Sequence, residues 1–334
     1  MTHAMLRPAR LCGTPPGGLD LGPISREMAL VERELAGAVA TADPALREVA
    51  LHVISAGGKR IRPAMGVAGY LVAGGTRPRE VIPLAAAVEM IHTATLLHDD
   101  VIDGSAVRRG RPAAHLRYGV QAAIVTGDFL FSAAFGICAR YGREIIRIAS
   151  EACRELAGAE MAQSIPLREM SEELCMDIAA RKTGSLMGAG METAAVLAGA
   201  PAGRRERLRR YGRLVGTAFQ IIDDCLDFRL DGSTGKVPCA DVLSGRATLP
   251  LVHAFGRSSG RERRDLESLL SPPADRKKLE RLVGLLGRSG SIDYARARAE
   301  ELCRTAREEL RPLRSSPCRR ILEDITHFVV ERTS

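Results

Sequence analysis

Apolar residues recur every three or four positions along most of the chain with charged residues between them, which is the pattern of amphipathic helices. Residues 24–39 follow this pattern, and Asp43-Pro44 predicts the N-cap and first turn of a helix that ends before Gly57-Gly58. We predict further helices over 62–72, 78–103, 120–141, 143–161, 171–197, 204–226, 249–255, 261–270, 275–286, 291–313 and 317–330.

The signals of β-strands and of internal repeats are absent from the sequence, and no linker rich in Ser, Gly and Pro divides it. The pattern therefore predicts an all-α fold, a single large helical bundle over residues 24–334 with a central cavity. Residues 1–23, which are rich in Pro, Gly and Arg, are expected to form a flexible N-terminal extension. The sharpest loop falls at 229–246.

Composition narrows the class of protein. The chain has 334 residues, of which 46% are hydrophobic and 4% aromatic, so it is not an intrinsically disordered tail. Its formal charge of +8 predicts an anionic partner. The eight cysteines include no CxxC pair and are expected to be reduced thiols in a cytoplasmic protein. The apolar stretch 120–139 contains Asp128, so we expect a buried core helix and not a membrane span.

Two DDxxD clusters end apolar helices, and their members are Asp99, Asp100 and Asp103, then Asp223, Asp224 and Asp227. Carboxylates four residues apart lie on one helix face and repel each other. A hard divalent cation such as Mg²⁺ would relieve this repulsion, because it takes carboxylate oxygens and completes its shell with water and phosphates. We expect the two helices to face each other across a cavity.

Basic residues accompany these clusters. Lys59, Arg60 and Arg62 follow the Gly57-Gly58 turn, and further arginines at 108, 109 and 111 follow the first cluster. The sequence therefore predicts two kinds of phosphate site, one through metal ions and one through Lys and Arg. Nucleic-acid binding is disfavoured, because the aspartates repel a phosphate backbone and few aromatic residues exist for stacking.

The segments GGKRIRP, IHTATLLHDDVIDGSAVRRGRP, GDFLF, RKTG, FQIIDDCLDF and TLPL occur in the order seen in trans-isoprenyl diphosphate synthases. The chain resembles the long-chain branch of that family, the enzymes similar to octaprenyl diphosphate synthase. The resemblance implies a homodimeric prenyltransferase that uses about three Mg²⁺ ions. Such an enzyme condenses an allylic diphosphate with successive isopentenyl diphosphates. The product is a long-chain all-trans polyprenyl diphosphate, which is a precursor of quinone side chains. The enzyme could associate peripherally with membranes through this lipid product.

The resemblance also implies roles for individual residues. The isopentenyl diphosphate ligands are Lys59, Arg62, His92 and Arg109, with Arg60 among the substrate-binding cations. The metal ligands are Asp99, Asp103, Asp223 and Asp227, while Asp100, Asp224 and Lys182 complete the catalytic set. The allylic diphosphate site comprises Arg108, Lys182, Thr183, Gln220 and Lys236. The chain departs from the family at Cys239-Ala240, where Gly-Asn is usual, and at Arg246, where Lys is common.

Product length is predicted from the residues that precede Asp99. Short-chain members of the family carry bulky aromatic rings four or five residues before this position, whereas this chain has Ala94 and Thr95. A long chain can therefore extend past them, with Met90 and Ile91 either as its lower walls or as core residues. A short- or medium-chain synthase and a non-catalytic regulatory subunit are the alternatives. A class I terpene cyclase would have no use for the second set of cations.

Overall fold

The computed structural model describes residues 19–40, 43–230, 239–271 and 275–332. Apart from one ladder of two short strands, the regular structure in these ranges is helical, which confirms the all-α prediction. The strands are β1 (Val107–Arg108) and β2 (Arg111–Pro112). The helices are α1 (Ser25–Ala38), α2 (Pro44–Ile54), α3 (Ile61–Ala73), α4 (Ile82–Ile102), α5 (Ala114–Tyr118), α6 (Val120–Ala139), α7 (Arg143–Ala162), α8 (Glu172–Ala179), α9 (Ser185–Leu197), α10 (Ala202–Asp227), α11 (Ala240–Leu243), α12 (Leu249–Arg257), α13 (Gly260–Leu270), α14 (Arg276–Arg288), α15 (Ser291–Leu310) and α16 (Pro317–Glu331).

Local side-chain chemistry explains where the predicted helices begin. Asp43 caps α2, because its carboxylate accepts hydrogen bonds from the backbone N–H groups of Ala45 and Leu46. Ser316 caps α16 in the same way. The short helices α5 and α11 were not predicted, because so few residues carry no readable periodicity.

One predicted helix, over 171–197, is interrupted in the structure. It divides into α8, a π-helical turn η4 (Ala180–Gly184) and α9. A π-helical turn widens the helical hydrogen-bond ladder, and such turns are frequent at functional sites. The apolar pattern continues through this turn, so periodicity alone does not reveal it.

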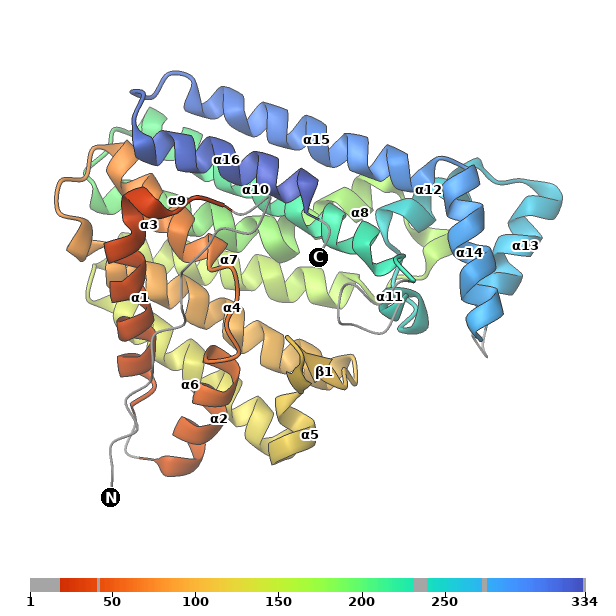
Figure 1. Ribbon diagram of the computed structural model, residues 1–334, viewed down its shortest axis with the longest axis horizontal. Helices are drawn as coiled ribbons and strands as arrows, with labels where there is room; N and C mark the ends of the chain where they lie inside the picture. Colours follow the sequence, from red (N-terminus) through yellow and green to blue (C-terminus); the bar gives the residue numbers. More distant parts are fainter. Residues whose placement is uncertain (1–18, 41–42, 231–238, 272–274, 333–334) are drawn as a thin grey trace.

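The long helices lie side by side, with α4 and α10 inside the bundle (Figure 1). Helix α4 packs against α1, α3, α6 and α9, and α10 packs against α9, α15 and α16. One large core cluster runs from Ile24 to Val329, and a smaller one joins α11 and α12 to the α13–α14 hairpin at one end of the molecule. Leu19 and Leu21 also pack against the large core, while residues 1–18 lie outside the described part of the chain.

Helix α6 differs from the buried core helix that we expected. Within the described residues, two helical stretches are long and apolar enough to cross a membrane, Pro78–Ile102 and Val120–Ala139, and their apolar windows are 72% and 39% buried. The first is therefore a core helix. The second exposes an apolar face that includes Val120, Ile124 and Val125, whose exposed fractions are 50%, 40% and 46%.

Candidate active site

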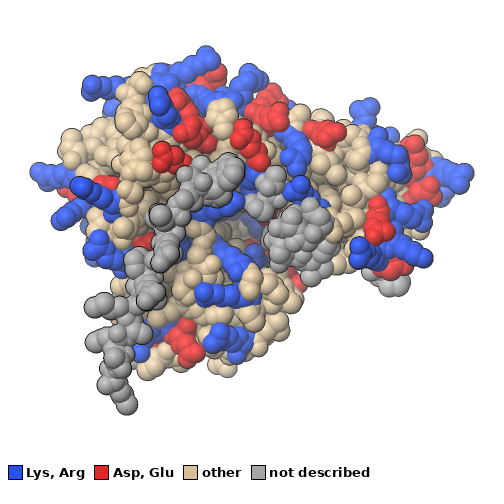
Figure 2. All heavy atoms as spheres, viewed as in Figure 1, with Lys and Arg blue, Asp and Glu red and all other residues tan. Residues whose placement is uncertain are grey.

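A cavity of about 970 Å³ opens between α3, α4, α7, α8, α10 and α11. It brings together residues from both DDxxD clusters and from the basic segments, as predicted. Those that line it are Lys59, Arg60, Arg62, His92, Asp99, Asp103, Arg108, Arg109, Lys182, Thr183, Gln220, Asp223, Asp224 and Asp227. In the space-filling view, Lys and Arg side chains border a hollow near the middle of the face shown (Figure 2).

In the first cluster, Asp99 in the last turn of α4 and Asp103, the residue that directly follows this helix, line the cavity. Burial raises the pKa of Asp99 to about 6, and it also raises the pKa of Asp103. Both carboxylates are therefore held in an environment that penalises their charged forms. A cation bound between them would offset that penalty.

Asp100 does not line the cavity, which corrects its assignment to the catalytic set. It lies about 100° around the helix from Asp99, and only 3% of its surface is exposed. Its carboxylate accepts a 2.9 Å hydrogen bond from Arg108 Nε and also pairs with Nη2 of the same side chain. Asp100 therefore positions Arg108, which β1 brings to the cavity.

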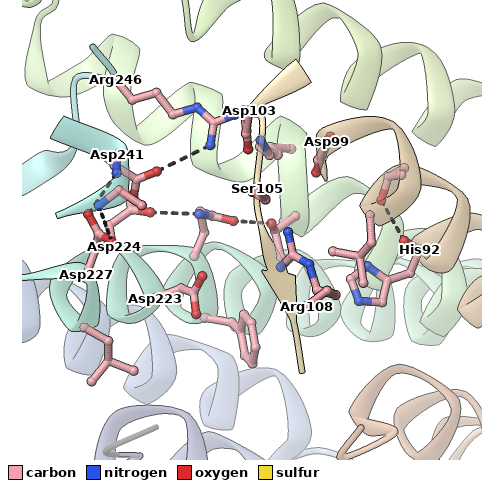
Figure 3. Close-up of a pocket in the computed structure, with 18 of the residues that line it drawn as sticks. His92, Asp99, Asp103, Ser105, Arg108, Asp223, Asp224, Asp227, Asp241 and Arg246 are labelled. Atoms are coloured by element: carbon pink, nitrogen blue, oxygen red, sulfur yellow. Dashed lines mark hydrogen bonds and ion pairs between the residues drawn. The ribbon is translucent and has the colours of Figure 1, made fainter. Parts of the chain in front are cut away.

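In the second cluster, the three carboxylates have different partners on α10 and beyond (Figure 3). Asp223 Oδ1 lies 3.1 Å from Arg332 Nη2, and Asp224 accepts a 2.8 Å hydrogen bond from Gln220. Burial raises the pKa of Asp224 well above its ordinary value.

Asp227 has an anchoring role in this structure. Its two carboxylate oxygens each accept a 3.0 Å hydrogen bond from a backbone N–H group, one from Ala240 and one from Asp241. These N–H groups start the short helix α11. In this structure Asp227 therefore holds α11 beside the cavity that it also lines, and its role as a metal ligand stays a prediction.

The basic half of the cavity begins at the Gly57-Gly58 turn, where both glycines adopt positive φ. Arg62 is partly buried, burial lowers its pKa to about 10, and its Nε is buried without a hydrogen-bond partner. The pKa of His92 is well below its ordinary value, mainly because the ring is buried and secondly because of the positive charge of Arg62. The ring is therefore neutral. The two side chains can donate hydrogen bonds to an anion in the cavity.

Arg60, which we placed among the substrate-binding cations, lines the cavity, and its side chain also anchors the scaffold. Its left-handed backbone, with φ 48°, opens α3. The guanidinium donates hydrogen bonds to Glu32 at 2.6 Å, to Glu89 at 2.9 Å and to the carbonyl of Ile54 at 2.9 Å. Arg60 therefore ties α1, α2 and α4 to the turn that presents Lys59 and Arg62.

The π-helical turn η4 supplies Lys182 and Thr183. Lys182 Nζ lies 2.5 Å from Glu160 Oε2 and 2.7 Å from Gln163 Oε1. Thr183 donates a 2.6 Å hydrogen bond to Gln220 of α10. The helices approach closely here because Gly184 leaves no room for a Cβ, which would lie 2.7 Å from the carbonyl oxygen of Arg213. Lys236, predicted to bind the same diphosphate, lies outside the described residues.

Sequence reasoning missed several residues of the site, chiefly Glu160, Gln163, Asp241 and Arg332. Glu160 and Gln163 lie at the C-terminal end of α7 three positions apart, a spacing that puts them on one helix face. Arg332 stacks on Phe219, with its guanidinium carbon 4.2 Å from the ring centroid. No local pattern connects these residues to the DDxxD clusters, because the contacts join segments far apart in the chain.

The departure at Cys239 has a structural consequence. Cys239 precedes α11 with a left-handed φ of 56°, a conformation that glycine adopts without cost and other residues at about 1 kcal/mol or more. It is fully buried in the smaller core. All seven cysteines in the described ranges are free thiols, as expected.

Of the predicted chain-length residues, only Thr95 lines the cavity. Ala94, Met90 and Ile91 are fully buried in the large core. The apolar part of the lining includes Leu96, Leu156, Ile178 and Leu186, together with Ile61, Phe219, Leu226 and Leu243. No Phe, Tyr or Trp of α4 is part of it, since α4 contains none.

The donor set of the cavity fits a hard divalent cation. Asp99, Asp103 and Asp223 line the cavity with carboxylate oxygens, and within the described ranges no three acidic, imidazole or thiol groups are placed to hold a metal ion by themselves. This arrangement suits Mg²⁺, which is bound in proteins by one or two carboxylates and takes the remaining ligands from water and substrate phosphates.

Comparisons with known proteins agree with this geometry. The all-trans-nonaprenyl-diphosphate synthase (geranyl-diphosphate specific) of Rhodobacter capsulatus is 36% identical over 318 residues, which cover 93% of this chain and 97% of the relative. The short chain isoprenyl diphosphate synthase of Methanothermobacter thermautotrophicus is also 36% identical, over 84% of this chain and 88% of the relative. Overall identity therefore does not distinguish product lengths.

Among solved structures, the polyprenyl synthase of Caulobacter crescentus, crystallised with calcium and isoprenyl diphosphate, superposes with a TM-score of 0.89. It is 36% identical in sequence, and the match covers 94% of this chain and 97% of that one. The sequence profile of the polyprenyl synthetase family matches residues 43–286, well over half of the chain. The chain therefore belongs to the polyprenyl synthetase family.

Proposed function

We propose that the protein is a Mg²⁺-dependent trans-prenyltransferase that condenses an allylic diphosphate with successive isopentenyl diphosphates to a long-chain polyprenyl diphosphate. One observation carries the proposal: a single cavity holds both carboxylate clusters and, beside them, a separate set of cations. Two diphosphates can therefore bind next to each other, one through metal ions and one directly.

At the allylic site, Asp99 and Asp103 on α4 would hold Mg²⁺ together with Asp223 on α10. When bound, Mg²⁺ supplies positive charge that stabilises the diphosphate as it leaves. Lys182, held by Glu160 and Gln163, lies on the same side of the cavity and adds a direct positive charge. The number of ions is proposed as about three, which is the number that the resemblance to the family implies.

At the second site, Lys59, Arg62 and Arg109 would hold isopentenyl diphosphate with its double bond toward the allylic carbon. The unpaired Nε of Arg62 and the neutral ring of His92 support this assignment. The proton released after condensation can pass to the departed diphosphate, so the scheme requires no general base from the protein.

A long product is supported by the lining below the aspartates. Thr95 and leucines from α4, α7 and α9 form an apolar wall there, without a Phe, Tyr or Trp from α4 to block the tail. The name of the Rhodobacter capsulatus relative agrees with this length. The proposed use of the product is as a precursor of quinone side chains.

We further propose a cytoplasmic homodimer that meets membranes peripherally through its lipid product. The exposed apolar face of α6, which includes Val120, Ile124 and Val125, supports the dimer because a face of this kind is stabilised by burial against a second copy.

The proposal is tested by measuring isopentenyl diphosphate incorporation by the purified chain alone. Asp99→Ala and Asp223→Ala should each lower the rate by at least about 100-fold, whereas Asp265→Ala, an exposed change on α13, should not alter it. Wild-type rates in both cavity variants would refute the mechanism. Absence of activity in the wild-type chain without a partner would favour the regulatory-subunit alternative.

A further inference from the structure

Arg246, where the family commonly has lysine, lies between the two carboxylate clusters (Figure 3). Its Nη2 contacts Asp103 Oδ1 and lies 3.5 Å from Glu160 Oε1, while Nη1 lies 3.4 Å from Asp241 Oδ1. The side chain is 18% exposed. One guanidinium therefore pairs with carboxylates from α4, from α7 and from α11.

These contacts continue to the second cluster. The backbone N–H of Arg246 donates a 2.8 Å hydrogen bond to the carbonyl of Asp241, and the backbone N–H of Asp241 donates to Asp227 Oδ2 at 3.0 Å. An unbroken series of contacts thus joins Asp103 on α4 to Asp227 on α10. Glu160, which pairs with Arg246, also holds Lys182 at 2.5 Å.

The position of the guanidinium puts it in competition with a metal ion. Asp103 faces the cavity with Asp99, and the oxygen that Arg246 contacts is one that a divalent cation at this cluster would take. The planar guanidinium can pair with two carboxylates at once, whereas a lysine ammonium is a single point charge. Arginine at this position carries the same charge as lysine, but its fork of donors can contact more carboxylates of the metal-free site at once.

We propose that Arg246 is a positioning residue that acts as the internal counter-cation of the metal-free site. It holds α11 against α4 and must release Asp103 when a divalent cation binds. It therefore stabilises the metal-free protein and weakens metal binding, and this inference rests on the function proposed above. A residue that served only the fold would affect stability alone, and one that only contacted diphosphate would strengthen ligand binding.

The test combines two measurements on full-length protein, with variants Arg246→Gln and Arg246→Lys and with Arg257→Gln, an exposed change on α12, as the matched control. Thermal unfolding is followed in EDTA. Mn²⁺ binding is followed by electron paramagnetic resonance, with and without inorganic diphosphate. We expect Arg246→Gln to unfold at a lower temperature in EDTA and yet to bind Mn²⁺ about tenfold more tightly. Arg246→Lys should fall between it and the wild type, and the control should match the wild type.

Unchanged or weaker Mn²⁺ binding by both Arg246 variants would overturn the proposal. So would a loss of binding confined to samples that contain inorganic diphosphate, because that result identifies a diphosphate contact. If Arg246→Gln does not fold, tighter Mn²⁺ binding by Arg246→Lys still decides the matter. If the Arg246 variants give either of these contradicting results but the wild type binds Mn²⁺ and condenses its substrates, the proposed function still holds. A wild type that binds no Mn²⁺ would refute both the role of Arg246 and the proposed function.

Discussion

Replacing Asp99 with asparagine removes a charge that the metal-free protein holds at an energetic cost. Burial raises the pKa of this carboxyl to about 6 from an ordinary value of 3.8. Each pKa unit corresponds to about 1.4 kcal/mol, so an ionised Asp99 lowers the free energy of unfolding by about 3 kcal/mol at neutral pH. Asp99→Asn should therefore be more stable than the wild type without metal, although it loses the ability to bind Mg²⁺.

The pH dependence of this effect has a definite sign. Because the pKa of Asp99 is higher in the folded than in the unfolded protein, the folded state binds the proton more tightly. The cost is absent below the unfolded pKa, grows as the pH rises between the two values and is complete above the folded pKa. At about pH 5 it is roughly half its value at neutral pH.

Urea unfolding in EDTA at neutral pH and near pH 5 measures the difference directly. The stability advantage of Asp99→Asn should shrink as the pH falls, and Asp265→Asn on the exposed side of α13 serves as the control. Equal stability of the wild type and Asp99→Asn at neutral pH, or lower stability of Asp99→Asn, would contradict this reasoning. Either result would mean that the charge of Asp99 does not destabilise the metal-free protein.

Other changes test the scaffold, the dimer and the product length. Arg60→Leu leaves the buried carboxylate of Glu89 without its partner and should lower the free energy of unfolding by about 3–5 kcal/mol; unaltered urea unfolding would contradict the anchoring role. Val125→Asp puts a charge on the apolar face of α6 and should yield a monomer by light scattering, so a persistent dimer would place the interface elsewhere. Thr95→Phe puts a ring at a position that lines the cavity and should shorten the product, whereas an unchanged series of products by chromatography would exclude this position.

The sequence was sufficient for the all-α fold and for most helices, because those depend on local apolar periodicity and on caps such as Asp43. The π-helical turn around Lys182 was not predictable, since it depends on the packing of Gly184 against α10. The exposed face of α6 was also missed, because composition alone cannot tell a core helix from one with an apolar surface.

Some residues of the site could likewise be predicted from the sequence, and others could not. Motif spacing identified Asp99, Asp103 and Asp223 correctly as cavity residues, because the helical repeat fixes which positions share a face. It could not separate Asp100 and Arg60 from their neighbours, since their anchoring roles depend on partners from distant segments. The contacts of Arg246 with three acidic residues are likewise a property of the folded chain.

The length of the polyprenyl chain that the wild-type enzyme makes decides whether the cavity is a long-chain prenyltransferase site. Purified protein is incubated with Mg²⁺, farnesyl diphosphate and an excess of isopentenyl diphosphate, and the hydrolysed products are sized by chromatography. The account predicts a ladder that ends in polyprenols longer than geranylgeraniol and that disappears in EDTA. No condensation would contradict the assignment of the cavity as a prenyltransferase site, and a product that stops at geranylgeraniol or shorter would contradict the long-chain assignment.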